Sequence, residues 1–363
     1  MPSQTACDGR TGHARRLGRA FRLGLNCRPG RAAQTSLAAL AAAALAAALF
    51  PAVARGDFFG AGENAFELPF VTVGAPGNAP DTTGAPNPAG SVGYPYRIGE
   101  FEVPEHAVRK ANAQSALDGA PLGLTLDERG PDKPATGLSW FEAARFVNWL
   151  NEDAGFAPAY KFDDGPGGSG AFQLWAPGDA GFNPANRFRN RLARYVLPSV
   201  DEWYKAAFYD PAKDAGAGGY WDYPTGSDDP PLPVASGTDA GTAVWNQITG
   251  PADVQLAGGA SPWGTVGQGG NVFEWQEGPL GGVLSLPTPD VRAFRGGDSV
   301  LSNSAFGLSN LSVGDRLSNF PGGPLGFRIA SVPEPRSIFA TLALALYTTA
   351  VRRNCVRYGI DRI

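Results

Sequence analysis

Short runs in which hydrophobic and polar residues alternate occur between Phe58 and Val103, and turns rich in Gly, Pro and Asn separate them. The clearest are residues 70–73 (FVTV) and residues 96–101 (YRIGEF). Alternation with a period of two is typical of strands that bury one face. The pattern therefore predicts strands at both places.

Two segments have the apolar spacing and the start signal of a helix. Ser139 and Glu142 form a capping box before AARFVNWLNED, and Ser199 and Glu202 form another before WYKAAFYD. In such a box the serine hydroxyl accepts a backbone N–H, while the glutamate reaches back to the cap. Pro211 is expected to end the second helix, because proline cannot continue one.

The rest of the chain, from about residue 212 to residue 330, is dense in glycine and contains only short apolar pieces. The whole chain has 49 Gly and 32 Pro, and charged residues make up only 18%. This composition favours loops and brief strands over a helical bundle. Because no low-complexity linker divides residues 55–331, we expect one loop-rich domain with about two main helices.

The first 54 residues have the pattern of an export signal. An arginine-rich stretch precedes the apolar run of residues 37–50, which ends near Ala52-Val53-Ala54, a small-x-small cleavage pattern. The run is short for a membrane span, which needs about 20 residues. A removed secretion signal with a long basic leader is expected; an uncleaved anchor, a downstream start or a twin-arginine signal at Arg15-Arg16 are the alternatives.

Near the C-terminus, Pro333-Glu334-Pro335 precedes an apolar segment, residues 338–351, and then Arg352-Arg353. With this order, residues 332–363 resemble the PEP-CTERM sorting signal of bacteria that make an exopolysaccharide matrix. The resemblance implies processing by a membrane exosortase. The protein is then exported to the cell surface or extracellular matrix and is anchored in the membrane only transiently. An ordinary C-terminal anchor is the alternative, with arginines that stop transfer.

Charge is distributed unevenly along the chain. The formal net charge is -4, but arginines are concentrated in residues 1–54 and 332–363, which leaves the region between them strongly acidic. An acidic surface repels phosphate backbones. Nucleic-acid binding is therefore not expected.

Five sequence blocks stand out along the chain: LSWFEAARFVNWL (138–150), LPSVDEWYKAA (197–207), GNVFEW (270–275), RGGD (295–298) and GFRIA (326–330). In this order and at these separations they resemble the formylglycine-generating enzyme family, also called the sulfatase-modifying factor domain. The resemblance covers roughly residues 65–330, and GEFEV (99–103) is similar to the family's opening strand. It implies an α+β fold: a loop-rich variant of the C-type lectin fold with short strands.

The departures from the family concern its catalytic metal. In the enzyme, two cysteines shortly before the Gly-Phe-Arg block bind copper, whereas Cys7, Cys27 and Cys355 all lie in the terminal segments of this chain. Serine and asparagine cannot replace a thiolate as a soft ligand and redox group. A related branch holds iron with three histidines, but this chain has only His13 and His106. Neither copper nor iron is expected, and no other cofactor is certain.

Calcium is a further candidate, because the block around Glu274 holds a structural calcium in some members of the family. Glu274 with the carbonyl oxygens of Gly270 and Val272 offers part of a hard-oxygen ligand set. The family's usual Asp or Asn seven positions earlier is Gly267 here. The alternative is a glutamate that is hydrogen-bonded within the protein.

Four aromatic residues are candidates for a sugar-stacking platform, because aromatic faces and nearby carboxylates such as Asp222 suit carbohydrate C–H faces and hydroxyls. They are Trp221, Tyr223, Trp245 and Trp263. The alternative is that they belong to the core. The pair Asp228-Asp229 before Pro230 is more simply a solvated turn than a pair of glycosidase carboxylates.

These observations favour an exported surface or matrix protein whose domain is a non-catalytic binding module for polysaccharide or a protein partner. Its other expected partners are exosortase and the secretion machinery. The alternatives are an enzyme of the same family with cysteine-independent chemistry and a calcium-stabilised adhesion or assembly protein. A shared fold does not decide among them.

Overall fold

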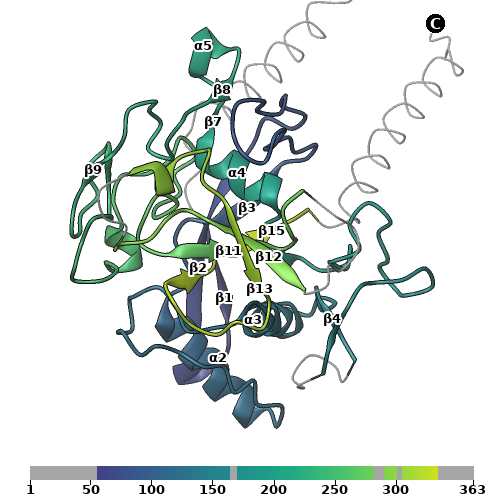
Figure 1. The fold of residues 1–363 in the computed structure, drawn as a ribbon. Coiled ribbons are helices and arrows are strands. Elements are labelled where there is room, and N and C mark those ends of the chain that lie inside the picture. Colours follow the sequence, from purple (N-terminus) through teal and green to yellow (C-terminus); the bar gives the residue numbers. More distant parts are fainter. Residues whose placement is uncertain (1–54, 164–169, 282–289, 301–304, 334–363) are drawn as a thin grey trace, which may run out of the picture. The chain divides into compact units, whose positions relative to one another are not determined.

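The computed structural model describes residues 55–163, 170–281, 290–300 and 305–333 (Figure 1). The secretion signal predicted at residues 1–54 lies outside the described residues. So does the sorting signal beyond Pro333, which includes Glu334, Pro335, Arg352 and Arg353. Within the described part of the chain, no helix is both long enough and apolar enough to cross a membrane.

The main sheet has five antiparallel strands in the order β1-β2-β3-β15-β6. They are β1 (Arg55–Phe59), β2 (Phe66–Val73), β3 (Tyr96–Gly99), β15 (Ala330–Ser331) and β6 (Tyr195–Val196). Strands β2 and β3 confirm the two strands predicted from alternation, although β3 ends at Gly99. Ala330 lies opposite both Ile98 and Val196, so the sheet joins segments far apart in the sequence.

The sheet is buried on both faces. Phe70 of β2 packs in the main core together with Trp140 and Phe146 of helix α3 (Trp140–Asp153). Its neighbour Val71 points to the other face and packs with Ala206 of helix α4 (Val200–Phe208). The two helices thus cover opposite faces of the sheet.

Both predicted capping boxes are confirmed. Glu142 donates its N–H to the Ser139 hydroxyl at 3.3 Å, and its carboxylate accepts from the Ser139 N–H at 2.8 Å. The corresponding distances at Ser199 and Glu202 are 3.2 and 2.7 Å. Each box satisfies backbone donors that would otherwise have no partner in the first turn.

The end of α4 differs from the expectation. The helix ends at Phe208 and does not continue to Pro211. The backbone of Tyr209 is extended, and β7 (Tyr209–Asp210) pairs with β8 (Gly219–Tyr220). The hairpin therefore takes the two residues that the sequence pattern assigns to the helix.

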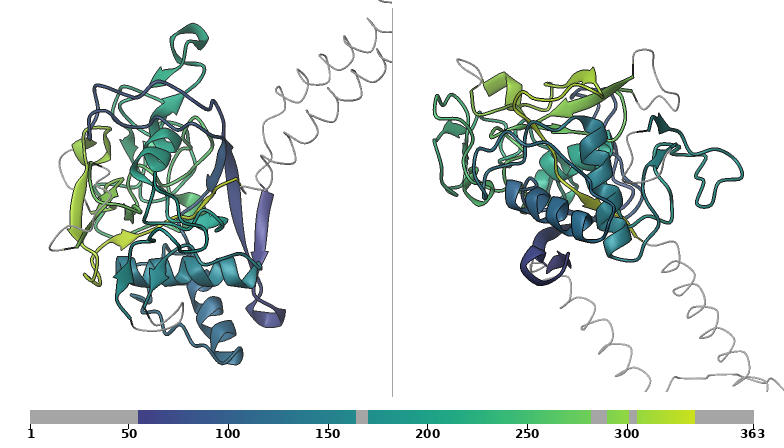
Figure 2. Two further views of the ribbon diagram at one scale, coloured as in Figure 1. Left: turned by 90° about the vertical axis from the view of Figure 1, so that its right-hand side faces the viewer. Right: turned by 90° about the horizontal axis from the view of Figure 1, so that it is seen from below.

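Helix α2 (Glu105–Leu117) is a helix that the sequence pattern does not predict. It starts after Pro104 without a side-chain cap, and its buried face consists mainly of small residues, Ala107, Val108 and Ala111. Such a face gives a weak periodic signal. Figure 2 shows α2 beside α3, which it contacts.

The chain after α4 consists mostly of loops and brief elements, as predicted. The largest is a four-stranded sheet, β13-β12-β11-β14. Its strands are β11 (Phe273–Trp275), β12 (Val291–Arg295), β13 (Gly314–Leu317) and β14 (Leu325–Gly326). The smaller elements after α4 are α5 (Lys213–Gly216), β9 (Leu232–Pro233), β10 (Thr242–Ala243), and 3-10 helices at Val254–Leu256 and Ala305–Leu308. Before α4 lie β4 (Lys161–Phe162), β5 (Phe172–Gln173) and a 3-10 helix at Gly62–Asn64. The result is the mixed α+β organisation expected from the sequence.

Candidate functional site

The described residues include none of the cysteines and one of the two histidines that the sequence analysis weighed as metal ligands. All three cysteines fall outside the described ranges, and His106 is the histidine within them. Its Nδ1 lies 3.0 Å from the Pro131 carbonyl oxygen and 3.6 Å from Asp132. Among the described residues, no cluster of three or more His, Cys, Asp or Glu side chains can hold a metal ion.

Glu274, the residue proposed for calcium, forms a fully buried ion pair with Arg328. The Arg328 Nη2 and Nε atoms each lie 2.6 Å from a different oxygen of the Glu274 carboxylate. Trp203 donates its indole N–H to the same carboxylate, also at 2.6 Å. Calcium binding at Glu274 with Gly270 and Val272 stays a prediction, and it requires Glu274 to exchange the guanidinium for the metal.

Glu102 fills the space beside Gly267, where the family's usual Asp or Asn is missing. A Cβ atom at Gly267 would lie 2.7 Å from a Glu102 carboxylate oxygen. Glu102 is buried, and its carboxyl group accepts from the Asn271 amide at 3.1 and 3.2 Å. Burial raises the pKa of Glu102 well above its usual value, and the charge of Glu274 raises it further.

The four candidate aromatic residues are all half-buried, and the structure brings two of them together. Tyr223 and Trp245 pack against one small cluster, which contains Ala305 and Leu308. Trp221 instead lies under the Lys213 ammonium, 3.9 Å from its ring centre. Trp263 packs against a different cluster, beside β2 and β3. A platform of all four residues stays a prediction.

Tyr223 and Trp245 belong to a group of loops that we call the loop cluster: residues 221–248, 299–300 and 305–311. Hydrogen bonds tie its segments together. The Trp245 indole N–H donates to the Pro231 carbonyl at 3.1 Å, and the Asn310 N–H donates to the Asp222 carbonyl at 2.8 Å. The Gln247 N–H donates to the Ser299 carbonyl at 2.8 Å. The two backbone bonds, made by Asn310 and Gln247, connect stretches that lie more than fifty residues apart in the sequence.

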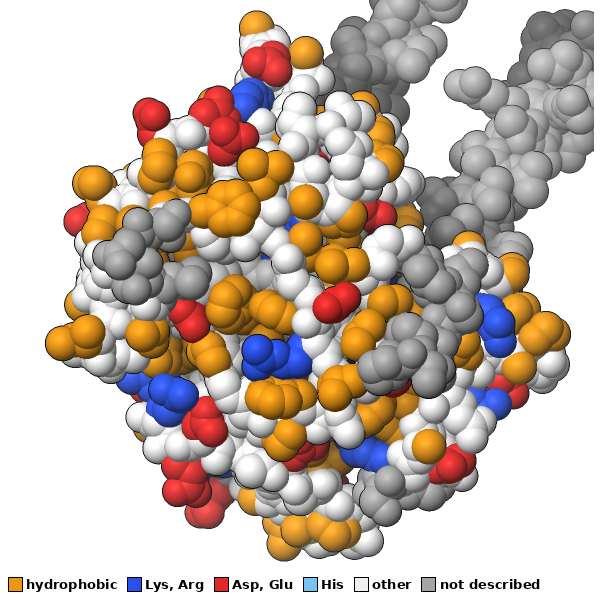
Figure 3. Space-filling view, in the orientation of Figure 1, with side chains coloured by type: hydrophobic (Ala, Val, Ile, Leu, Met, Phe, Trp, Pro, Cys, Tyr) orange, Lys and Arg blue, Asp and Glu red, His pale blue; other side chains and the backbone are white. Residues whose placement is uncertain are grey.

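The loop cluster exposes several large apolar side chains. Its most exposed large apolar side chains are Leu232 (68%), Ile248 (100%), Val300 (57%), Phe306 (57%) and Leu311 (49%). Figure 3 shows hydrophobic side chains spread over the face of the molecule on which β9 lies. A collection of exposed apolar residues on one surface marks an interaction site more often than scattered single residues do.

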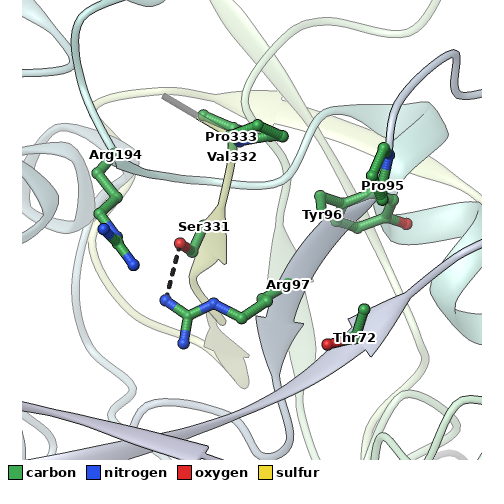
Figure 4. A pocket seen from close by; sticks show the side chains of 8 residues that line it. All are labelled: Thr72, Pro95, Tyr96, Arg97, Arg194, Ser331, Val332 and Pro333. Carbon is green, nitrogen blue, oxygen red and sulfur yellow. Dashed lines mark hydrogen bonds between the residues drawn. The ribbon is translucent and has the colours of Figure 1, made fainter. Parts of the chain in front are cut away.

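A pocket of about 390 Å³ is lined in part by the last described residues of the chain, Ser331, Val332 and Pro333. Figure 4 shows Arg97 and Arg194 reaching toward Ser331 from two sides of this pocket. Arg97 donates to both oxygens of Asp57, at 3.1 and 2.5 Å. Burial raises the pKa of Asp57, but hydrogen bonds from Arg97 and Tyr195 outweigh it and leave that pKa below its usual value. Asp57 therefore neutralises much of the positive charge in this pocket.

A second cavity, of about 440 Å³, is lined by four separate segments of the chain. They are residues 86–88, residues 185–188, the start of α4 and residues 277–281. Its polar wall includes Asp201 and Glu277, and burial raises the pKa of both carboxyl groups. Sequence reasoning does not identify this cavity, because the segments that form it are separated by up to about two hundred positions.

Glu277 belongs to a buried charge cluster behind this cavity. Arg189 donates to both oxygens of Glu202 at 3.0 and 2.8 Å, and its Nε lies 2.6 Å from a Glu277 oxygen. Burial raises the pKa of Glu202, but the charge of Arg189 outweighs it and the net shift is downward. One guanidinium thus serves two carboxylates, and the cluster stays acidic.

Comparisons with known proteins agree with this architecture. The model of the sulfatase-modifying factor enzyme 1-like domain family matches residues 77–332. Treponema denticola variable protein 1 has a similar structure, with a TM-score of 0.52 and 19% identity over 77% of this chain and 99% of that protein. A crystal structure of CarF is similar as well, with a TM-score of 0.51 and 20% identity over 73% of this chain and 98% of CarF.

At these identities the structural likeness shows the fold alone, and no curated protein sequence matches the chain. The family model carries more weight, because it spans well over half of the sequence and includes the five blocks. The fold, with its two capped helices and its short strands in long loops, agrees with it. The chain therefore belongs to the sulfatase-modifying factor enzyme 1-like domain family.

Proposed function

We propose that this protein is an exported surface or matrix protein and that its domain binds polysaccharide through the loop cluster without catalysing a reaction. One observation carries the proposal. Tyr223 and Trp245 pack against Ala305 and Leu308, in the stretch before the Gly-Phe-Arg block where the enzymes keep their cysteines. An aromatic surface in that position favours binding over thiol chemistry.

The chemistry of the loop cluster suits a sugar. The half-exposed rings of Tyr223 and Trp245 offer faces for carbohydrate C–H groups. Asp222 is exposed beside them, and its Oδ1 accepts from the Asn310 amide at 3.3 Å. A carboxylate held in place by an amide is a fixed acceptor for sugar hydroxyl groups.

Export is part of the same proposal. It is supported by the signal-like pattern of residues 1–54 and the Pro-Glu-Pro pattern with its apolar segment in residues 332–363. From these patterns we infer that the secretion machinery and an exosortase are partners. An exported domain would meet the polysaccharide of the producing cell, which supports that ligand class.

The proposal is tested by binding of the full-length protein to the exopolysaccharide of the producing bacterium. The test variant is Tyr223→Leu with Trp245→Leu, because leucine keeps apolar packing while it removes the ring faces. We expect its affinity to fall about tenfold or more, which corresponds to about 1.4 kcal/mol. Pull-down at graded protein concentrations measures the affinity.

Phe58→Leu is the matched control, because Phe58 is a 72% exposed aromatic residue on β1, outside the loop cluster. It is expected to bind as the wild type does. A double variant with wild-type affinity, or a wild-type protein that binds no polysaccharide, contradicts the proposal.

A further inference from the structure

We propose that the 440 Å³ cavity beside α4 binds one sugar unit that carries hydroxyl or amino donors and no acidic group. The inference rests on the proposed function, because it assumes that the domain binds polysaccharide. It adds a second contact site and a sugar class. The argument depends on the size of the cavity, its acceptors, its charge and its apolar wall.

The cavity has the size and construction of a small-molecule site. Its volume of about 440 Å³ falls within the range of about 300–1,000 Å³ that is usual for ligand pockets. Its walls come from four segments, one of which is the capped first turn of α4. A site fixed by a helix end and by buried charges is largely formed before a ligand arrives.

Glu277 provides a buried acceptor that cannot easily move. Its side chain is 1% exposed and lines the cavity. The Asn186 amide donates to its Oε2 at 2.7 Å, and the Tyr160 hydroxyl donates to its Oε1 at 3.2 Å. With Arg189 at 2.6 Å from Oε1, the carboxyl group is held in a single orientation.

Asp201 provides a second acceptor, in the first turn of α4. Its Oδ1 accepts from the Gly90 N–H at 2.7 Å, which fixes the side chain. Its Oδ2 makes no hydrogen bond to any residue that the structure describes. A fixed carboxylate with one open oxygen is suited to accept a hydrogen bond from a ligand.

The charge of the wall selects the class of sugar. Among the residues that the structure describes, no Lys or Arg side chain lines the cavity, whereas Asp201 and Glu277 both do. Arg189 lies behind the wall, where it is shared by Glu202 and Glu277. An acidic sugar would bring its carboxylate toward Asp201 and Glu277, and no cation of the described lining would contact it, which costs free energy. Hydroxyl and ammonium groups instead find acceptors.

Part of the lining is apolar. Phe188 is 4% exposed and lines the cavity together with Pro86, Pro88 and Pro279. A sugar ring has C–H faces as well as hydroxyl edges, so apolar and acceptor residues in one lining match its two kinds of surface. Polar groups on a mostly apolar lining are the usual arrangement in ligand sites.

The cavity is joined to the loop cluster through Asn310. The Ala85 N–H donates to the Asn310 carbonyl at 3.0 Å, next to the Pro86 wall. The Asn310 N–H in turn donates to the Asp222 carbonyl at 2.8 Å, next to Tyr223. One residue therefore links the cavity wall to the loop that carries Tyr223.

The test titrates the full-length protein with single sugars by calorimetry, in a detergent that has no sugar headgroup. The probes are glucose, galactose, mannose, glucosamine and glucuronic acid. We expect at least one neutral sugar or glucosamine to bind, and glucuronic acid to bind at least about tenfold more weakly.

Two variants locate the binding. Asp201→Asn keeps the acceptor for Gly90 but replaces the open oxygen with a donor, and we expect about tenfold weaker binding. Ala185→Trp introduces a large side chain at an exposed position on the cavity wall, and we expect binding to be lost. The controls are Glu128→Gln and Ala113→Trp, which alter exposed positions away from the cavity and should bind as the wild type does.

The inference is overturned if no probe binds the wild type, if glucuronic acid binds as tightly as the neutral sugars, or if both cavity variants bind like the wild type. Its failure is distinguishable from failure of the proposed function. If no single sugar binds in the cavity but the protein still binds polysaccharide through Tyr223 and Trp245, only the inference about the cavity is overturned. Absence of any polysaccharide binding overturns the proposed function.

Discussion

Among single residues, the buried carboxylates Glu274 and Glu102 are important for the stability of this protein. Glu274 accepts two bonds from Arg328 and one from Trp203, all at 2.6 Å. Removing one partner of such a buried pair leaves an uncompensated charge, which typically costs about 3–5 kcal/mol. These contacts give Glu274 a structural role. Its own sequence block does not reveal that role, because its partner Arg328 lies 54 positions away.

Glu102 is expected to make stability depend on pH. Burial raises its pKa in the folded protein, so the folded state holds a proton that the unfolded state releases above about pH 4.5. The contribution to stability is complete below that pH, and it is lost as the pH rises toward the raised pKa. The free energy of unfolding should fall by up to about 1.4 kcal/mol per pH unit from this group.

Glu102→Gln mimics the protonated form and removes this slope. Urea unfolding between pH 5 and pH 8 should show the variant gaining stability relative to the wild type as the pH rises. Glu128→Gln controls for the loss of an exposed carboxylate. Parallel curves for the wild type and Glu102→Gln would show that Glu102 is not held protonated in the folded protein.

Residues of the candidate sites differ in how visible they are in the sequence. Tyr223 and Trp245 could be proposed from the sequence because aromatic residues near carboxylates suit the C–H faces and hydroxyl groups of a sugar. Their separation from Trp263 is not recognisable, since it depends on which cluster each ring joins. The sequence does not show that Asp201 and Glu277 belong together, because only the folded chain brings them to one cavity.

Helices α3 and α4 are well predicted because their start signals are local. A serine and a glutamate three residues apart determine each start, and no distant contact is needed to recognise them. Helix α2 lacks a side-chain cap, and its buried face is built from alanine and valine. Its stability comes from packing beside α3, which a local pattern cannot report.

Ser139→Ala tests the cap of α3. The serine hydroxyl accepts the Glu142 N–H, so its removal should destabilise the protein by about 1 kcal/mol. This corresponds to a decrease in Tm of about 2–4 °C for a domain of this size, measured by circular dichroism. Ser139→Thr retains a hydroxyl and should lose less. An unchanged Tm in the alanine variant would mean that the cap contributes little.

At the scale of the whole molecule, the fold joins the two ends of the domain. Strand β15 pairs with β3 and β6, so the last described strand completes a sheet that begins at Arg55. The Gly-Phe-Arg block precedes β15 directly and supplies Arg328 to the buried pair. The five sequence blocks therefore maintain the scaffold, which explains how the family could be recognised from sequence while the ligand could not.

The proposed function requires that this scaffold binds a ligand and does not oxidise cysteine to formylglycine, the reaction of the enzymes in this family. The most direct test incubates the full-length protein with copper, oxygen and a peptide that carries a sulfatase-type cysteine motif, and then measures the peptide mass. We expect the cysteine peptide to stay unchanged. Formation of formylglycine that depends on the protein would contradict the proposed function.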